Sequence, residues 1–408
     1  MSRALARNDD QPDVESDAGD LSLDDVASDS YLLERDLVAA GFTSWRHRGT
    51  WFVAGPDADK GPTIGAVGSF SPLTAKLHIH LVDDRRLQHN ALRAAGLPVP
   101  SSRTFRARRA DDIVRYAASL GSPVVLRSIS HKRPSILIGG LDGGEAINDA
   151  LTRILEARGG RATVQVEADA GGSEYRLLTT PLGTISAIEV DRRHGGDHST
   201  DERPAQRVTV GRVRLYTRGG LDRRGTVTDV TDDVHPELLD LAARAAAACP
   251  GLGHAEVHLR STGHRSVDDA RGATVLAVDP SPLLGTHEYP HHGQGGRVTG
   301  RWLAGIADPP WHDRDAFRSH DAITVNIDEE PDLDAAEDRL TTLVAELGLE
   351  IVGTPARAGG LRCDVTGPLG VLTLLSPLLS RAAGSTSAMI VQTERIAASR
   401  SANPGAGS

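Results

Sequence analysis

Aromatic side chains are scarce in this chain of 408 residues, where Phe, Trp and Tyr together make up 3%. Proteins that bind single-stranded nucleic acid stack the bases on exposed aromatic rings beside basic residues, so the composition argues against that function. The 45 basic and 55 acidic side chains give a net charge of −10, which disfavours a broad surface for duplex nucleic acid. We therefore expect no nucleic-acid partner.

Cysteine, lysine and long apolar runs are also rare. Cys249 and Cys363 are the only cysteines, and their separation fits neither a metal site nor a disulfide framework, which is typical of a reducing compartment. No apolar run approaches the roughly 20 residues of a membrane span, and the acidic start is unlike a signal peptide. The sequence therefore predicts a soluble, cytoplasmic protein without membrane contact. Lys60, Lys76 and Lys132 are the only lysines, so a phosphate site must rely mostly on arginine.

Negative charge is concentrated at the N-terminus. Residues 1–30 contain nine Asp and Glu against two Arg, which gives this segment a net charge of −7. Segments with high net charge bury too little apolar surface to fold. We therefore expect residues 1–30 to be a disordered tail, and residues 395–408 to be a second one. An arm that binds a protein partner is the alternative interpretation of the acidic tail.

The remaining sequence has an ordinary globular composition, with 39% apolar and 25% charged residues. This composition and the chain length predict two or three domains. Residues 31–83 are expected to form a small α/β domain. Residues 84–300 alternate helices and strands around one hairpin, which indicates two α+β lobes. Residues 318–394 follow the order βαββαβ of a ferredoxin-like domain. The predicted fold class is therefore α/β.

Six short motifs occur in a fixed order between residues 84 and 297. They are Asp84-Arg85 at a helix start, Ala95-Gly96-Leu97-Pro98-Val99-Pro100 at its end, the strand Pro123-Val124-Val125-Leu126-Arg127, then Glu174-Tyr175-Arg176, residues 225–236, and Val278-Asp279-Pro280-Ser281-Pro282 with the loop 287–293. In this order they resemble the ATP-grasp superfamily, most closely the central domain of cyanophycin synthetases and related glutathione-forming ligases. Residues 225–236 are the most specific match.

The resemblance implies an ATP-grasp fold whose two lobes clasp ATP. It also implies a ligase that activates a small-molecule carboxylate as an acyl-phosphate, which a small-molecule amine then attacks, with ATP and Mg²⁺ as cofactors. Arg85 and Arg127 stand where family members carry lysines, and they keep the charge; with Glu167 and Glu174 they are the predicted nucleotide-binding residues. Arg176 is the predicted catalytic residue. For Glu174 and Arg176 a surface ion pair is the alternative, and for Glu167 a plain strand-end carboxylate.

The metal positions depart from the family. Mg²⁺ prefers oxygen ligands, and the resemblance implies Asp, Glu and Asn where this chain has His258, Ala277 and Asp279. Side chains alternate along a strand, so Glu256 points the same way as His258. These two could join Asp279 in a site for Mn²⁺ or Zn²⁺ instead. Asp279, Glu256 and His258 are therefore the predicted metal ligands. For His287, His291 and His292, which could join them, solvated loop histidines are the alternative.

The flap is a further departure, because the glycine-rich segment that covers the phosphates in the family is replaced by residues 130–135, which contain no glycine. Two functions of different classes follow. One is a divergent ATP-dependent carboxylate–amine ligase. The other is a catalytically degenerate relative that binds nucleotide or an amino-acid-derived ligand and acts through a partner. The resemblance also implies a homodimer.

Overall fold

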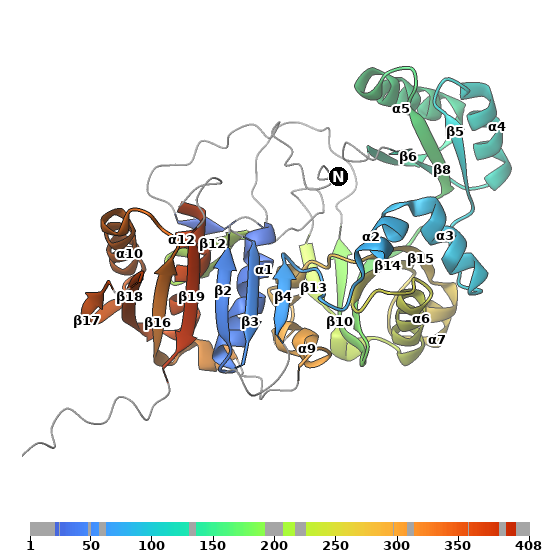
Figure 1. Ribbon diagram of the computed structural model, residues 1–408. Helices are drawn as coiled ribbons and strands as arrows, with labels where there is room; N and C mark the ends of the chain where they lie inside the picture. The colour runs from blue at the N-terminus through green and yellow to red at the C-terminus, as the bar shows by residue number, and fades with distance from the viewer. Residues whose placement is uncertain are drawn as a thin grey trace, which may run out of the picture.

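The computed structural model describes residues 21–23, 25–47, 50–56, 63–129, 136–191, 207–216, 226–296, 298–307, 314–357, 359–382 and 389–396. Seven-stranded and five-stranded sheets with their helices form the main body, and a four-stranded lobe stands apart at one end (Figure 1). Among these residues no helix has the length and apolarity needed to cross a membrane. The predictions for residues 1–20, 130–135 and 397–408 fall outside the described residues.

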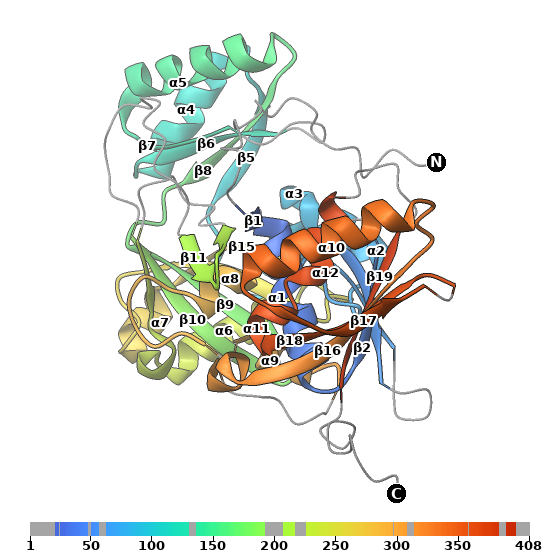
Figure 2. The same cartoon turned by 90° about the vertical axis from the view of Figure 1, so that its left-hand side faces the viewer.

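The largest sheet has the strand order β17-β18-β16-β19-β2-β3-β4. Its first four strands are antiparallel neighbours in the ferredoxin-like order that the sequence predicted. β2 pairs with β19, so the N-terminal strands continue the same sheet (Figure 2). The strands are β16 (His320–Asp328), β17 (Glu350–Ala356), β18 (Leu361–Pro368), β19 (Ile390–Arg395), β2 (Thr43–His47), β3 (Trp51–Gly55) and β4 (Ile64–Val67).

Helices α10 (Leu333–Leu347), α11 (Leu369–Leu372) and α12 (Leu375–Ala382) pack against this sheet. α10 begins where Asp332 accepts a hydrogen bond from the Ala335 backbone and ends at Gly348, which has a left-handed backbone. The predicted order βαββαβ has one helix between its third and fourth strands, but the structure has two there, α11 and α12. The break has a physical cause, because Pro377 has no backbone N–H and is tolerated only in the first turn of a helix.

The N-terminal helix α1 (Asp25–Ala39) corrects the predicted tail, which was expected to extend to residue 30. Ser28 and Ser30 are buried, and Asp29 accepts a hydrogen bond from the backbone N–H of Gly285 at 2.7 Å. A short strand, β1 (Ser22–Leu23), precedes the helix and pairs with β12. Net charge was misleading here, because Asp29 and the hydroxyl groups of Ser28 and Ser30 are bonded within the fold.

The four-stranded lobe is antiparallel, in the order β5-β8-β6-β7. Its elements are β5 (Ser102–Arg106), α4 (Ala110–Leu120), β6 (Val124–Ile129), β7 (Leu137–Leu141), α5 (Gly143–Arg158) and β8 (Thr163–Ala168). Both helices pack on one face of the sheet around Leu126, Val164 and Val166. The chain leaves the lobe through Gly171 and Gly172, whose φ angles are +64° and +72°, values that favour glycine.

The five-stranded sheet has the order β13-β10-β9-β14-β15. Its strands are β9 (Ser173–Thr180), β10 (Gly183–Asp191), β13 (Thr226–Asp229), β14 (Ala255–Ser261) and β15 (Thr274–Asp279). The surrounding elements are α2 (Lys76–Asp83), α3 (Arg85–Ala94), α6 (Pro236–Ala247), α7 (Val267–Gly272), α8 (Leu284–Glu288), α9 (Val298–Ala304), β11 (Arg207–Val210), β12 (Val213–Tyr216) and 3₁₀ turns at Thr231–Asp233 and Arg314–Arg318. The predicted fold class, α/β with two α+β lobes and a ferredoxin-like domain, is confirmed.

Candidate functional site

The open face of the four-stranded lobe is polar. Leu126 and Val166 point into the core under α4 and α5, and alternation along the strands places Arg127, Gln165 and Glu167 on the opposite face. Gln165 lies directly across from Arg127 in the register of β6 and β8. A cation, an amide and a carboxylate therefore share the face that the helices leave uncovered.

Arg85 joins this lobe to the rest of the molecule. It lies in the first turn of α3, and its guanidinium group reaches the carboxylate of Glu167 at the end of β8. Two hydrogen bonds form, Nε to Oε1 at 2.8 Å and Nη2 to Oε2 at 3.0 Å. The side chains are 15% and 5% exposed. The structure thus brings together Arg85 and Glu167, which are 82 residues apart in the sequence.

Helix α3 is fixed along the edge strand β15 by two residues that sequence reasoning missed. The side-chain amide of Gln88 donates to the carbonyl of Val278 at 2.7 Å and accepts from its N–H at 3.2 Å. His89 Nε2 lies 3.0 Å from the carbonyl of Leu276. Both side chains are buried although they are polar. Polar residues on the inner face of an amphipathic helix are the sequence pattern that could have indicated these contacts.

Charge at the lobe junction keeps Glu167 ionised. Burial raises the pKa of Glu167, but the hydrogen bonds and charge of Arg85, followed by the charge of Arg127, lower it more, so the net shift is downward. Two guanidinium groups therefore act on one carboxylate. Arg85, Arg127 and Glu167 together carry one net positive charge, which favours an anionic ligand.

A second group of predicted residues lies on one face of the five-stranded sheet. Arg176 is directly opposite His258 in the register of β9 and β14, and Glu256 is directly opposite Asp279 in the register of β14 and β15. Cross-strand partners share a face, and so do positions two apart on one strand. Glu174 therefore lies on this face as well. We call these five residues the Glu256 cluster.

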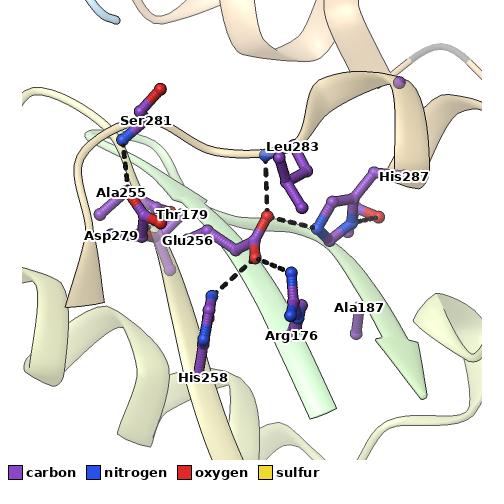
Figure 3. Close-up of polar contacts among 12 residues, drawn as sticks. Arg176, Thr179, Ala187, Ala255, Glu256, His258, Asp279, Ser281, Leu283 and His287 are labelled. Carbon is purple, nitrogen blue, oxygen red and sulfur yellow. Dashed lines mark hydrogen bonds and ion pairs between the residues drawn. The ribbon is translucent and has the colours of Figure 1, made fainter. Parts of the chain in front are cut away.

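Glu256 is at the centre of the cluster (Figure 3). Its Oε1 accepts hydrogen bonds from Arg176 Nη1 at 3.2 Å and from His258 Nε2 at 2.7 Å. Its Oε2 accepts from the backbone N–H of Leu283 at 2.9 Å and lies 3.5 Å from His287 Nε2. The side chain is 1% exposed. Both carboxylate oxygens are thus occupied by donors of the chain itself.

These contacts shift the pKa values of the two opposed carboxyl groups in different directions. Burial raises the pKa of Glu256, but the charge of Arg176, the hydrogen bond from His258 and the nearby imidazole of His287 bring it well below the usual range. For Asp279 burial is the largest effect and raises the pKa, and the nearby charge of Glu256 adds to the rise. The ion pairs are therefore centred on Glu256 rather than on Asp279.

His287 comes from α8, which the N-terminal helix holds in place. His287 Nδ1 lies 2.8 Å from the hydroxyl oxygen of Ser186, and the ring is fully buried. The next residue, Glu288, accepts a hydrogen bond from Arg35 of α1 at 3.3 Å. Sequence reasoning missed Ser186 and Arg35, since neither lies in a motif and both act through contacts between distant segments.

The residues at the lobe junction fit a nucleotide. Arg85 and Arg127 are donors for phosphate oxygens, and Glu167 is an acceptor for hydroxyl or amino groups. Gln165 is 2% exposed, and its Oε1 accepts no hydrogen bond from the described part of the chain. A buried acceptor without a donor is costly, and an amino group of a ligand would satisfy it.

A divalent cation fits the sequence-predicted metal ligands poorly. In the ranges that the structure describes, no group of three or more His, Cys, Asp or Glu side chains is arranged to hold a metal ion. Two of the predicted ligands, Glu256 and His258, are bonded to each other, and Glu256 also accepts a hydrogen bond from Arg176. Asp279 accepts from the backbone N–H of Ser281 at 2.8 Å and is the remaining carboxylate.

A cavity of about 340 Å³ adjoins the Glu256 cluster. Glu174 belongs to its wall and also accepts a hydrogen bond from Arg176 Nε at 3.3 Å. The other lining residues are Gly172, Ser173, Glu189, Val190, Asp191, Thr226, Thr228 and Arg260. The volume is at the lower end of the range of small-molecule sites.

Comparisons with known proteins give distant structural likenesses. No protein-family model and no curated protein matches the sequence. The chain is 16% identical to a bifunctional glutathione synthetase from Pasteurella multocida, over 63% of this chain and 40% of that one, with a TM-score of 0.43. It is 15% identical to the ATP-grasp ligase PsnB, over 58% and 64%, with a TM-score of 0.37. A RimK domain protein from Sphaerobacter thermophilus is 19% identical, over 56% and 66%, with a TM-score of 0.34. The chain spans less than two thirds of the first two structures, and likenesses this remote assign no activity.

Proposed function

We propose that this chain is a divergent ATP-grasp protein that binds ATP where its two lobes meet and joins a carboxylate to an amine. One observation carries the proposal. Arg85, from the main body, is paired with Glu167 of the four-stranded lobe, and Arg127 lies on the same face of this lobe as Glu167. Guanidinium groups from two sides of a junction are suited to a polyphosphate. The order of the six motifs supports the same assignment.

The chemistry divides between the two groups of residues. ATP supplies the phosphoryl group that turns a substrate carboxylate into an acyl-phosphate. Arg85 and Arg127 bind the phosphates, and Glu167 and Gln165 bind the nucleoside. Arg176 stabilises negative charge near the reacting carboxylate, and its two carboxylate partners hold its guanidinium group in place.

Small-molecule substrates fit the space available. The cavity beside Glu174 has room for one small molecule, and we assign it to the carboxylate or the amine substrate. A homodimer, a cytoplasmic location and a protein partner for the acidic tail stay predictions from the sequence. The nucleotide site does not depend on any of them.

A second candidate is a degenerate relative that binds nucleotide without forming a bond. It is favoured by the contacts of Glu256, both of whose oxygens are bonded within the chain. Phosphoryl transfer usually relies on metal ions to neutralise the developing charge, so a carboxylate whose oxygens are already bonded within the chain suits binding better than transfer. The arginines at the lobe junction are equally compatible with this function.

Two measurements separate the candidates. Calorimetric titration of the full chain with ATP and ADP tests the site that both candidates share. Release of inorganic phosphate is then screened against pairs of amino acids as carboxylate and amine substrates. The ligase predicts nucleotide binding and phosphate release that depends on a substrate pair. Nucleotide binding without phosphate release, for every pair of amino acids, supports the degenerate relative. Absence of nucleotide binding contradicts both candidates.

A further inference from the structure

We propose that the Glu256 cluster is closed by ion pairs within the chain and holds no divalent cation, so that the nucleotide at the lobe junction binds without a metal ion from this cluster. The inference deepens the proposed function, because it rests on ATP as the ligand of the lobe junction. The sequence predicted a metal here, with Asp279, Glu256 and His258 as ligands. The structure instead shows a group of ion pairs that is closed on itself (Figure 3).

The first argument is the occupation of Glu256. A carboxylate that binds a metal directs lone pairs at the ion, whereas this one receives donors on both oxygens: Arg176 and His258 on Oε1, and a backbone N–H on Oε2. The side chain is 1% exposed. A metal ion would have to displace a buried guanidinium group, and separating a buried ion pair is strongly unfavourable.

The second argument is the composition of the opposite strand. Asp279 is directly across from Glu256, but Ala277 is directly across from His258. The side chain of alanine has no atom that can coordinate a metal ion. A metal site at this position would therefore have no protein ligand on that side. Mg²⁺ demands near-octahedral oxygen coordination, and a single carboxylate that is already bonded to the backbone N–H of Ser281 does not provide it.

The third argument is the position of the Arg176 guanidinium group. It forms ion pairs with both Glu174, at 3.3 Å, and Glu256, at 3.2 Å. It therefore lies between the two carboxylates, where a bridging metal ion would have to sit. A dication beside Glu256 would lie close to this guanidinium group and would be repelled by it.

His258 is a more exposed member of the cluster than its neighbours. Its side chain is 20% exposed, against 5% for Arg176 and 1% for Glu256. Its Nε2 is directed at Glu256, which fixes the orientation of the ring. This ring nitrogen is therefore bonded within the chain and is not available to a metal ion.

Direct metal titration tests the inference without nucleotide. Mn²⁺ is titrated calorimetrically into the purified full chain and, as a matched control, into Asp279→Asn. We expect the wild type to have no Mn²⁺ site that depends on Asp279 and has a dissociation constant below about 1 mM. Binding that persists in Asp279→Asn lies elsewhere in the chain and agrees with the proposal. Binding tighter than about 1 mM that is lost in Asp279→Asn would overturn it.

Nucleotide titration provides the second arm. The dissociation constant of ATP is measured in EDTA and again in Mg²⁺, with the expectation that the two values agree within about threefold. A larger gain of affinity in Mg²⁺ that disappears in Asp279→Asn would overturn the inference, and a gain that persists in this variant reflects phosphate-bound Mg²⁺ away from the cluster and agrees with it. If ATP does not bind at all, the proposed function fails, and the Mn²⁺ titration alone decides whether the cluster is free of metal.

Discussion

Arg85 donates two parallel hydrogen bonds to Glu167 across the junction between the four-stranded lobe and the main body. Bidentate pairing of guanidinium and carboxylate fixes both distance and angle, so this contact orients the lobe relative to α3. The same two side chains are assigned to the nucleotide. A ligand at the junction therefore competes with the pair, and the orientation of the lobe is linked to the occupancy of the site.

The ion pair should contribute measurably to stability. We expect Arg85→Met and Glu167→Gln each to destabilise the chain, with a coupling energy of about 1 kcal/mol, because the pair is bidentate but partly exposed. A double-mutant cycle by urea unfolding at pH 7 measures the coupling. Additive effects of the two substitutions would show that the contact does not hold the lobe.

The same pair should produce a dependence of stability on pH. The pKa of Glu167 is lowered in the folded chain, so its stabilising contribution is present above the unfolded pKa and is lost as the pH falls through the folded pKa. We expect the difference in unfolding free energy between wild type and Glu167→Gln to be constant from pH 6 to 8 and to shrink below about pH 4.5. A difference that grows on acidification would contradict the assignment.

Gly172 should tolerate substitution less well than its neighbour Gly171. Both have positive φ, so alanine at either position costs about 1 kcal/mol. A Cβ atom at Gly172 would lie 2.3 Å from the carbonyl oxygen of Ser261, whereas at Gly171 it meets no atom within 4 Å. We expect Gly172→Ala to lower the melting temperature by several degrees more than Gly171→Ala. Equal shifts would indicate that the backbones are not closely packed at this connection.

Removing the charge of Glu256 should be strongly destabilising. In Glu256→Gln the buried guanidinium group of Arg176 loses a charged partner, and breaking a buried pair in this way costs about 3–5 kcal/mol. Glu237→Gln, at a residue whose side chain is 51% exposed, is the control and should change stability by less than about 0.5 kcal/mol. Equilibrium unfolding of both variants measures the contrast. A loss below about 1 kcal/mol for Glu256→Gln would contradict the buried ion-pair cluster.

Buried histidines should weaken the fold in mild acid. Burial lowers the pKa of His89 to about 4, below its unfolded value of about 6.5, so the unfolded chain takes up a proton that the folded chain rejects. Stability then falls as the pH drops from about 6.5 towards 4. Between pH 7 and 5 we expect His89→Gln to lose about 2 kcal/mol less unfolding free energy than the wild type. The control, His320→Gln at an exposed residue, should lose as much as the wild type. An unchanged slope in His89→Gln would refute the assignment of a buried neutral imidazole.

Local patterns in the sequence predicted much of the fold. The leucines and valine of α10 recur at helical spacing, as the first helix of the predicted order βαββαβ requires, and the structure has this helix at Leu333–Leu347. The strand that ends near Arg127 and the hairpin of β9 and β10 also follow from apolar runs and turn residues. What local patterns could not show was the continuation of the ferredoxin-like sheet by β2, because its pairing with β19 joins the two ends of the chain.

The candidate site was predicted in its residues but not in its contacts. Motif positions pointed to Arg85 and Glu167 separately, and no pattern indicated that they pair. Ser186 and Gln88 were missed because they belong to no motif, and their contacts depend on the packing of distant segments. Residues that reach each other only through tertiary structure leave little local signal.

Calorimetric titration of ATP into wild type, Arg127→Gln and Arg115→Gln tests the central claim most directly. Arg127 lies on the open face of the four-stranded lobe, whereas Arg115 lies on the opposite, helical side with a 77% exposed side chain. We predict that wild type and Arg115→Gln bind ATP equally and that Arg127→Gln binds it at least tenfold more weakly. Equal affinities in all three proteins, or no binding by any of them, would contradict a nucleotide site at the junction of the lobes.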